Sequence, residues 1–204
     1  MSTPEDKTKL AQFDEFFSID YRFNINVSPL GSAQLPSYEE FIEEMPAPFK
    51  IASEITTLDQ SALRPLQAVA GVASQLMEYL NHQAQKMDLL VGYILSQENV
   101  ENDRFQATKF GGGGIIFNTN LESTFNIGDF IYLKLFFAED NSALFCLGEI
   151  ISCEENDDHK QHKVVFHHIR EKDRELLVRN SLHQQSKQLQ ALAQQRNEAK
   201  NTQT

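Results

Sequence analysis

The stretch Lys109-Phe-Gly-Gly-Gly-Gly-Ile-Ile-Phe117 contains four successive glycines that lead directly into an apolar run. Because glycine has no Cβ, such a backbone can take positive φ and approach a ligand or another segment closely. A short link then leads to a Gly128-Asp129 turn and to a run that ends in Lys134-Leu-Phe-Phe137. The order of these parts predicts a loop, a short strand, a turn and a long strand.

Several runs on either side have the composition of short strands separated by polar turns. The predicted strands are Phe105 to Lys109, Gly114 to Asn118, Phe130 to Phe137, Ala143 to Cys153 and His162 to His168. Short strands at such regular spacing predict an antiparallel barrel or sandwich.

The loop, short strand, Gly-Asp turn and long strand together resemble the second half of the PilZ domain. This domain is a small bacterial β-barrel known chiefly as a receptor for cyclic di-GMP. The segment from Arg170 to Arg179 resembles the helix that closes that domain. The resemblance covers about residues 104 to 190 and implies a barrel rather than a sandwich.

Two ligand motifs of the PilZ family are degenerate in this chain. Where the family has D/N-x-S-x-x-G, Lys109 stands at the acid or amide position, Gly111 replaces Ser, and only Gly114 matches. Lysine donates hydrogen bonds where an acceptor is needed, and glycine has no hydroxyl. The resemblance therefore does not predict cyclic di-GMP binding at the usual site.

The family's second motif, R-x-x-x-R, is expected upstream of the glycines. Between Gly71 and Lys109 the only arginine is Arg104, while Arg170 and Arg174 have the right spacing at the wrong end. If cyclic di-GMP binds at all, we expect a different set of residues, such as Lys109, Arg104 and groups of a neighbouring subunit.

Near the N-terminus, apolar and polar residues alternate from Ile19 to Val27, which is the pattern of a strand with one buried face. Such a strand needs a partner, for example Lys50 to Ile55 or another chain. A proline-rich connector follows, in which Tyr38 to Glu44 predicts a short acidic helix.

A long helix is predicted from Leu63 to Gln97, with apolar residues at alternating spacings of three and four. This heptad pattern is typical of a coiled-coil seam and predicts an oligomer interface. Gln83 is the polar exception, and such a residue often fixes register or oligomer number. The seam consists of Leu66, Val69, Ala73, Leu76, Leu80, Gln83, Met87, Leu90 and Ile94.

A second helix, from about Glu171 to Gln195, has a shorter and more polar heptad and could lie beside the first. Its pattern residues are Val178, Leu182, Gln185, Leu189 and Leu192. Two such seams beside one barrel favour self-assembly, from dimer to tetramer.

The predicted fold class is α+β, a PilZ-like antiparallel β-barrel preceded and followed by long coiled-coil helices, with an N-terminal extension that contains one strand. We divide the chain into the extension at 1–57, the long heptad helix at 58–100, the barrel at 101–170, and a C-terminal helix with a frayed tail at 171–204.

Composition and charge limit the classes of partner that this protein is expected to bind. The net charge of −11 would repel a nucleic-acid backbone, and no apolar run approaches the length of a membrane span. The sequence start lacks a secretory signal, so we expect a cytoplasmic protein. Cys146 and Cys153 lie within one predicted strand and are expected to be reduced.

The carboxylates and histidines of the sequence do not form a pattern that predicts a catalytic site. The carboxylates lie in turns and at helix starts, where solvation explains them, and His167 and His168 should face opposite sides of a strand. We therefore expect no enzyme activity, no metal and no cofactor.

The resulting hypothesis is an oligomeric regulatory adaptor in cyclic di-GMP signalling and surface motility, with an unidentified protein partner. The alternatives are a cyclic di-GMP sensor that uses a non-canonical site and switches its helices, and a purely structural coiled-coil scaffold.

Overall fold

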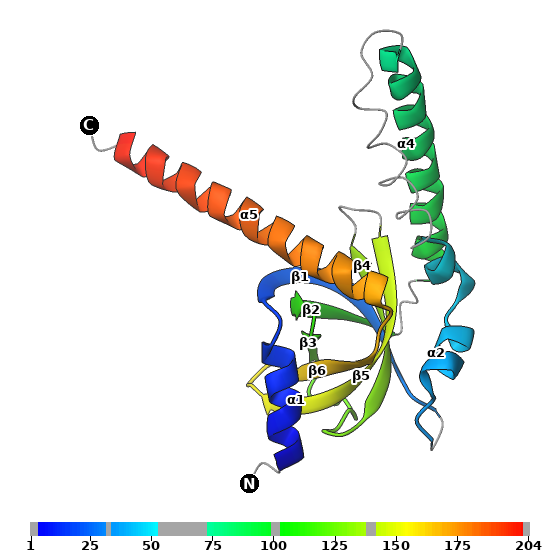
Figure 1. The fold of residues 1–204 in the computed structure, drawn as a ribbon. Coiled ribbons are helices and arrows are strands. Elements are labelled where there is room, and N and C mark those ends of the chain that lie inside the picture. The colour runs from blue at the N-terminus through cyan, green and yellow to red at the C-terminus, as the bar shows by residue number, and fades with distance from the viewer. Residues whose placement is uncertain (1–3, 32–33, 53–72, 99–102, 138–141, 202–204) are drawn as a thin grey trace. The chain divides into compact units, whose positions relative to one another are not determined.

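The computed structural model describes residues 4–31, 34–52, 73–98, 103–137 and 142–201 (Figure 1). It has an α+β fold in which six antiparallel strands form a closed barrel. The strands are β1 (Ser18–Pro29), β2 (Arg104–Gly111), β3 (Gly114–Thr119), β4 (Phe130–Phe137), β5 (Ser142–Glu155) and β6 (Lys160–His168). The helices with assigned bounds are α1 (Pro4–Asp14), α2 (Tyr38–Glu44), α4 (Ala73–Gln97) and α5 (Glu171–Asn201).

Alternation of apolar residues produces the barrel strands. In β4, for example, Ile131, Leu133 and Leu135 are fully buried, whereas Tyr132 and Lys134 between them are only half-buried. Successive side chains of a strand point to opposite faces, so the first set fills one face. The five strands predicted downstream of residue 103 are thus present, with slightly different ends.

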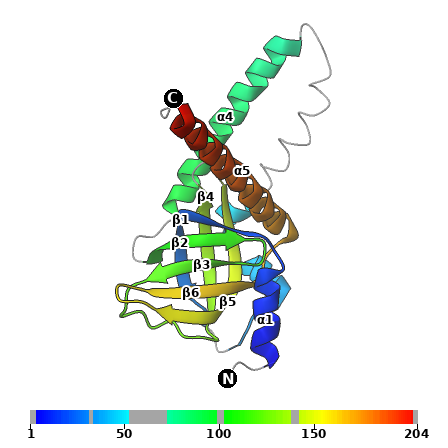
Figure 2. The same cartoon turned by 90° about the vertical axis from the view of Figure 1, so that its left-hand side faces the viewer.

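Strand order around the barrel is β1-β2-β3-β6-β5-β4, and Figure 2 looks onto β1, β2, β3 and β6. The N-terminal strand is therefore part of the barrel. It pairs antiparallel with β4, with Val27 opposite Leu133. The suggested pairing with Lys50 to Ile55 is wrong, because residues 47–52 are helical as far as the structure describes them.

The predicted turn at Gly128 and Asp129 joins the end of a loop to β4. Gly128 has φ of 92°, a left-handed conformation that favours glycine, and its N–H donates to the carbonyl of Ile150 at 2.8 Å. The carboxylate of Asp129 accepts a hydrogen bond from the N–H of Asn126 at 2.7 Å. These bonds explain why Gly-Asp is suited to this position.

Two compact units share the chain. The first, here called the glycine-loop unit, comprises Met1–Arg22, Gln106–Asp129 and Gly148–Thr204. The second, here called the α4 unit, comprises Phe23–Phe105 and Phe130–Leu147. Each contains one of the two regions that the sequence singled out.

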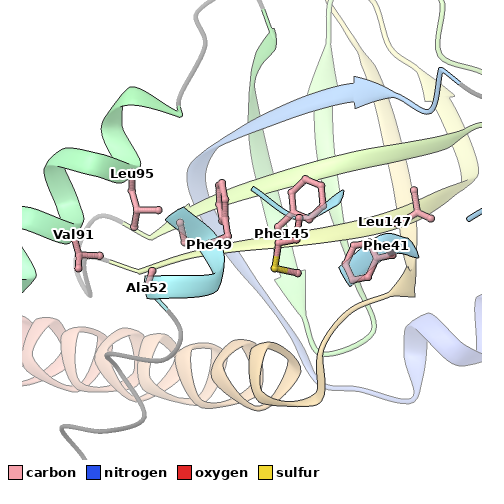
Figure 3. Close-up of a cluster of buried hydrophobic side chains, with 9 residues drawn as sticks. Phe41, Phe49, Ala52, Val91, Leu95, Phe145 and Leu147 are labelled. Atoms are coloured by element: carbon pink, nitrogen blue, oxygen red, sulfur yellow. The ribbon is translucent and has the colours of Figure 1, made fainter. Parts of the chain in front are cut away.

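The α4 unit has an apolar cluster on the face of β4 that carries Tyr132 (Figure 3). From α4, only the side chains of Val91 and Leu95 are buried in this cluster among the described residues of the helix. Phe145 of β5 stacks on Phe41 of α2 at a centroid distance of 5.6 Å. The buried members are Phe41, Met45, Phe49, Ala52, Val91, Leu95, Ala143, Phe145 and Leu147. Leu144 and Cys146 are buried on the opposite face, so both faces of β5 are covered, which explains the unbroken buried run from Ser142 to Ile150.

The helices agree with the sequence in part. Helix α2 has the predicted bounds and begins with a capping box, in which Ser37 and Glu40 bond to each other's backbone N–H groups. The predicted helix from Leu63 is described only from Ala73 onward, and the earlier residues lie outside the described part. Helix α5 continues to Asn201, beyond the predicted end, and α1 was not predicted. None of the described helices is both long and apolar enough to span a membrane.

Candidate functional site

The glycine loop, residues Gly111 to Gly114, is in close contact with the segment that follows α1. A Cβ added at Gly111 would lie 2.4 Å from the carbonyl oxygen of Phe17. At Gly112 it would lie 2.6 Å from the ring of Phe16, and at Gly114 2.0 Å from the carbonyl oxygen of Val164. These separations are far below van der Waals contact, so glycine is required for the chain's own packing.

Aromatic side chains at the end of α1 cover this loop. Phe13 is buried, and its ring would lie 2.8 Å from a Cβ at Gly114. The ammonium of Lys163 lies 5.0 Å from the centre of the same ring. The role of Phe13, Phe16 and Phe17 was not predicted from the sequence, although three phenylalanines just before a strand were a signal of local packing.

The arginine pair at the start of α5 has structural partners. Arg174 donates to the carbonyl oxygen of Gly112 at 2.6 Å, and its guanidinium lies 5.3 Å from the ring centre of Phe16. Arg170 forms two hydrogen bonds with Asp173, at 2.6 and 3.0 Å, and both side chains are buried. Burial raises the pKa of Asp173, while Arg170 opposes that rise. Both guanidinium groups therefore hold the glycine loop or the helix start in place.

The residues predicted for a degenerate nucleotide site are brought together only in part. Lys109, Gly111 and Gly114 lie in the glycine-loop unit, whereas Arg104 begins β2 in the α4 unit. Lys109 forms an ion pair with Asp20, whose carboxylate oxygen lies 3.4 Å from the ammonium nitrogen. Gly111 and Gly114 are buried.

A polar hollow of about 450 Å³ lies within the glycine-loop unit. Asp20, Tyr21 and Arg22 of β1 line it together with Thr108 of β2. Asp20 and Arg22 are exposed, so the hollow has both a negative and a positive group. Lys109 directly follows Thr108 in the chain and pairs with Asp20, so it lies beside this hollow, although none of the predicted site residues lines it.

The histidines have local packing partners. His162 is buried, contacts the hydroxyl of Thr119 at 2.9 Å and stacks on Phe117 at 5.1 Å between ring centres. Burial, with a smaller effect of Lys160, lowers the pKa of His162. The rings of His167 and His168 lie 4.4 Å apart, closer than strand alternation suggested. Within the described residues, no group of three or more His, Cys, Asp or Glu side chains is arranged to hold a metal ion.

The predicted seam on α4 is exposed toward the C-terminal end of the helix. Leu90 is 58% exposed, and Met87 and Ile94 are each 44% exposed. Leu80 and Gln83 are half-buried. Ala73 and Leu76 belong to the helix without a description of their side chains, and Leu66 and Val69 lie outside the described residues.

Seam and packing residues occupy neighbouring stripes of α4. Val91 and Leu95 contact the apolar cluster, and each directly follows a seam residue, Leu90 or Ile94. At about 100° per residue, Val91 lies close to Met87 and Ile94 around the helix, so the seam runs along the flank of the contact that holds α4 and is left uncovered by it. An apolar stripe of this kind is a typical protein interaction surface.

Comparison with solved structures identifies the fold. A protein of Xanthomonas campestris, described as a tetrameric PilZ domain self-assembled via an unusual helical bundle, superposes with a TM-score of 0.56 and 13% identity over 88% of this chain and 96% of that chain. The Bacillus subtilis inhibitor of motility gives a TM-score of 0.47 at 8% identity, covering 85% of this chain and 51% of that one. Escherichia coli YcgR in complex with c-di-GMP gives 0.38 at 11% identity, covering 47% and 42%.

The chain has a PilZ-like fold, a six-stranded antiparallel barrel with a long helix after its last strand. This confirms the resemblance and the fold class predicted from the sequence. The chain spans about half the length of the inhibitor-of-motility structure. No protein-family model and no curated protein matches the sequence.

Proposed function

We propose that this protein is a non-enzymatic regulatory adaptor in cyclic di-GMP signalling and surface motility. It assembles into a homo-oligomer through α4 and acts through contacts with other proteins. In this proposal residues 58–100 form the assembly segment, and the seam from Leu66 to Ile94 is the interface.

The exposed seam of α4 carries this proposal. Met87, Leu90 and Ile94 place three large apolar side chains in water at the heptad positions of a coiled coil. Burying each of them against a second helix would contribute roughly 1–2 kcal/mol. The Xanthomonas campestris protein with the similar fold self-assembles through a helical bundle, which supports the same role for α4 here.

The packing of the glycine loop supports a degenerate nucleotide site. The groups that reach this loop from upstream are the rings of Phe13 and Phe16 and the backbone carbonyl of Phe17, whereas phosphate binding needs arginines. Gly111 faces the carbonyl of Phe17, so a serine at this position would collide with the backbone. Lys109 already pairs with Asp20.

The polar hollow favours one rival function, a cyclic di-GMP sensor that uses other residues. Arg22 and Lys109 supply positive charge at or beside this hollow, as a phosphate ligand would require. The same hollow contains Asp20, whose negative charge opposes such a ligand. We therefore prefer the adaptor.

Isothermal titration of the full chain with cyclic di-GMP separates the two functions. The adaptor predicts no saturable binding at micromolar concentration, and a mass above that of one chain in light scattering. Micromolar binding that disappears in Arg22→Ala and Lys109→Ala, but persists in the nearby exposed variant Asn24→Ala, would establish the sensor and overturn the degenerate-site proposal.

A further inference from the structure

His162 of β6 is fully buried in the glycine-loop unit, close to the point where β3 ends and the loop of residues 120–129 begins. Its ring stacks on that of Phe117 of β3, with 5.1 Å between ring centres. Phe125 of the loop meets the same ring at 5.9 Å in a T-shaped contact, and it meets Phe117 at 6.1 Å. These three rings contact one another and are here called the aromatic trio. Two of them belong to the sheet and one belongs to the loop.

The hydrogen bonds of His162 indicate where the proton of its neutral ring lies. Its Nε2 atom is 2.9 Å from the hydroxyl oxygen of Thr119, and that hydroxyl donates to the carbonyl oxygen of Asn120 at 3.2 Å. A hydroxyl has one hydrogen, so Nε2 carries the imidazole proton and donates it to Thr119. Nδ1 is then an unprotonated acceptor, which is buried without a hydrogen-bond partner among the described residues. An unpaired acceptor is tolerated in a protein interior more readily than an unpaired N–H group.

Protonation of His162 is unfavourable while the aromatic trio is closed. A second proton would turn Nδ1 into a buried N–H donor without an acceptor. The ring face of Phe117 attracts a cation, but it replaces neither the hydrogen bond nor the water that a buried imidazolium loses. The charged form of the ring is therefore stable only where water can reach it.

The charges on the neighbouring elements do not compensate a proton on His162. After burial, the field of Lys160 lowers the pKa of His162 further, and Lys160 also donates to the carbonyl oxygen of Ser123 in the loop at 3.4 Å. Glu149 of β5 is in an ion pair with α1, and Asp129 accepts a hydrogen bond from a backbone N–H of its own loop. The other carboxylates of the loop, of the end of β5 and of the following turn are exposed; they are Glu122, Glu154, Glu155, Asp157 and Asp158.

The middle of the loop is attached to the barrel mainly through Phe125. The far end of the loop is tied to β5, because Gly128 donates to the carbonyl oxygen of Ile150 at 2.8 Å. Before that point Phe125 is half-buried, whereas Leu121 and Ile127 are 41% and 62% exposed. A segment with so little buried apolar surface opens locally at low cost in free energy. The contact of Phe125 with the aromatic trio is therefore well placed to control this opening.

We propose that His162 is a pH-sensitive latch for residues 120–127 of the loop. The neutral ring keeps Phe125 on the barrel, whereas the protonated ring needs water at Nδ1. Phe117 is fixed opposite His162 in the ladder of β3 and β6, so Phe125 is the ring that moves aside to admit water. The open loop binds a proton at the ordinary histidine pKa of about 6.5, and the closed loop binds it only at lower pH. The loop is thus closed above this pH and opens as the pH falls below it, independently of the α4 seam.

An NMR titration of the full chain tests the contact between ring and loop. The ring nitrogens of His162 should show the neutral proton on Nε2, and the ring should titrate below the ordinary histidine pKa. Phe125→Ala should let water reach the ring and raise the pKa of His162 toward its ordinary value. Leu121→Ala changes an exposed residue of the same loop and is the matched control, which should leave that pKa unchanged. A neutral proton on Nδ1, or an unchanged pKa of His162 in Phe125→Ala, would overturn the proposal.

Hydrogen exchange between about pH 7.5 and 5.5 tests the movement of the loop, with rates expressed as protection factors to remove the intrinsic pH dependence of exchange. Below about pH 6.5 the opening constant at the amides of Ser123 and Phe125 should rise by up to tenfold per pH unit. The amide of Phe166, which donates to the carbonyl oxygen of Gly113 at 3.0 Å, should keep its protection. His162→Phe keeps an aromatic ring that cannot titrate and should abolish the pH dependence. Loop protection that is the same at both ends of the pH range, or a pH dependence that survives in His162→Phe, would also overturn the proposal.

Discussion

Apolar side chains are buried around the glycine loop but exposed to solvent along the seam of α4. Around the loop, Phe13 and Phe16 fold back onto the backbone and leave no room for even a methyl group at Gly112 or Gly114. On α4, Leu90 remains in water although an apolar cluster lies one residue away along the helix. A conspicuous sequence motif can therefore mark internal packing, while a plain heptad pattern can mark a surface that is kept for another chain.

The largest effect is expected from Leu90→Asp, which tests whether the seam is an interface. Truncation of a leucine buried between chains costs about 2–5 kcal/mol per subunit, and a buried charge costs more. Light scattering should show the mass of one chain while circular dichroism shows a folded protein. Gln85→Asp, on an exposed position away from the seam, should keep the wild-type mass. A folded Leu90→Asp variant with the wild-type mass would remove α4 from the proposed interface.

Gly114→Ala tests whether the glycine loop is tightly packed. The new methyl group would meet the carbonyl oxygen of Val164 and the ring of Phe13, so the free energy of unfolding should fall by about 2–4 kcal/mol. Urea denaturation measures this change. Gly31→Ala is the matched control, since nothing lies within 4 Å of its added Cβ. Equal stability of the two variants would mean that the loop is open rather than packed.

Arg174→Ala tests whether the Arg174 side chain stabilises the glycine loop. The variant loses a charge-assisted hydrogen bond to Gly112 and the contact with Phe16, which together should cost about 1.5–3 kcal/mol. Hydrogen exchange at the amides of the glycine loop should accelerate. Arg174→Lys keeps the charge without the planar guanidinium and should fall between wild type and Arg174→Ala. Unchanged exchange in the alanine variant would show that Arg174 does not fasten the loop.

Gln83→Leu gives the smallest expected effect and concerns the specificity of the seam. Gln83 is half-buried in the single chain and is the polar member of the heptad pattern. Replacement should stabilise the assembly by about 1 kcal/mol while producing a mixture of masses. A lower melting temperature with one unchanged mass would instead indicate that Gln83 makes a satisfied hydrogen bond.

Local patterns predicted the elements well, because alternation and turn chemistry depend on neighbours in the sequence. The strand from Ile19 to Val27 and the turn at Gly128 are examples. The partner of that strand was not predictable in the same way. Both β1 and β4 alternate regularly, and alternation does not encode which distant strand completes a ladder.

The site was harder to predict than the fold. A run of four glycines does not reveal whether a ligand or a side chain such as that of Phe16 packs against it. The residues that cover the loop lie about a hundred positions earlier in the sequence. Helix α1 has no apolar stripe, although Pro4 after Ser2 and Thr3 is a common helix start and was an available signal. In α5 the buried residues include Leu177 and also Asn180, Ser181 and Gln184, so the heptad leucines Leu182, Leu189 and Leu192 fall on the exposed side.

The position of β1 in the barrel also determines that, during synthesis, α4 is made before β1 can pair with its neighbouring strands. Both strands that flank β1 follow α4 in the chain, and Val27 must wait for Leu133. At a translation rate of roughly 5–20 residues per second, that delay is on the order of 5–20 seconds. For this time β1 has unpaired edges on the nascent chain while α4 has already been made. Helices of neighbouring nascent chains on one messenger can therefore meet before any barrel has closed, which favours assembly between products of the same transcript.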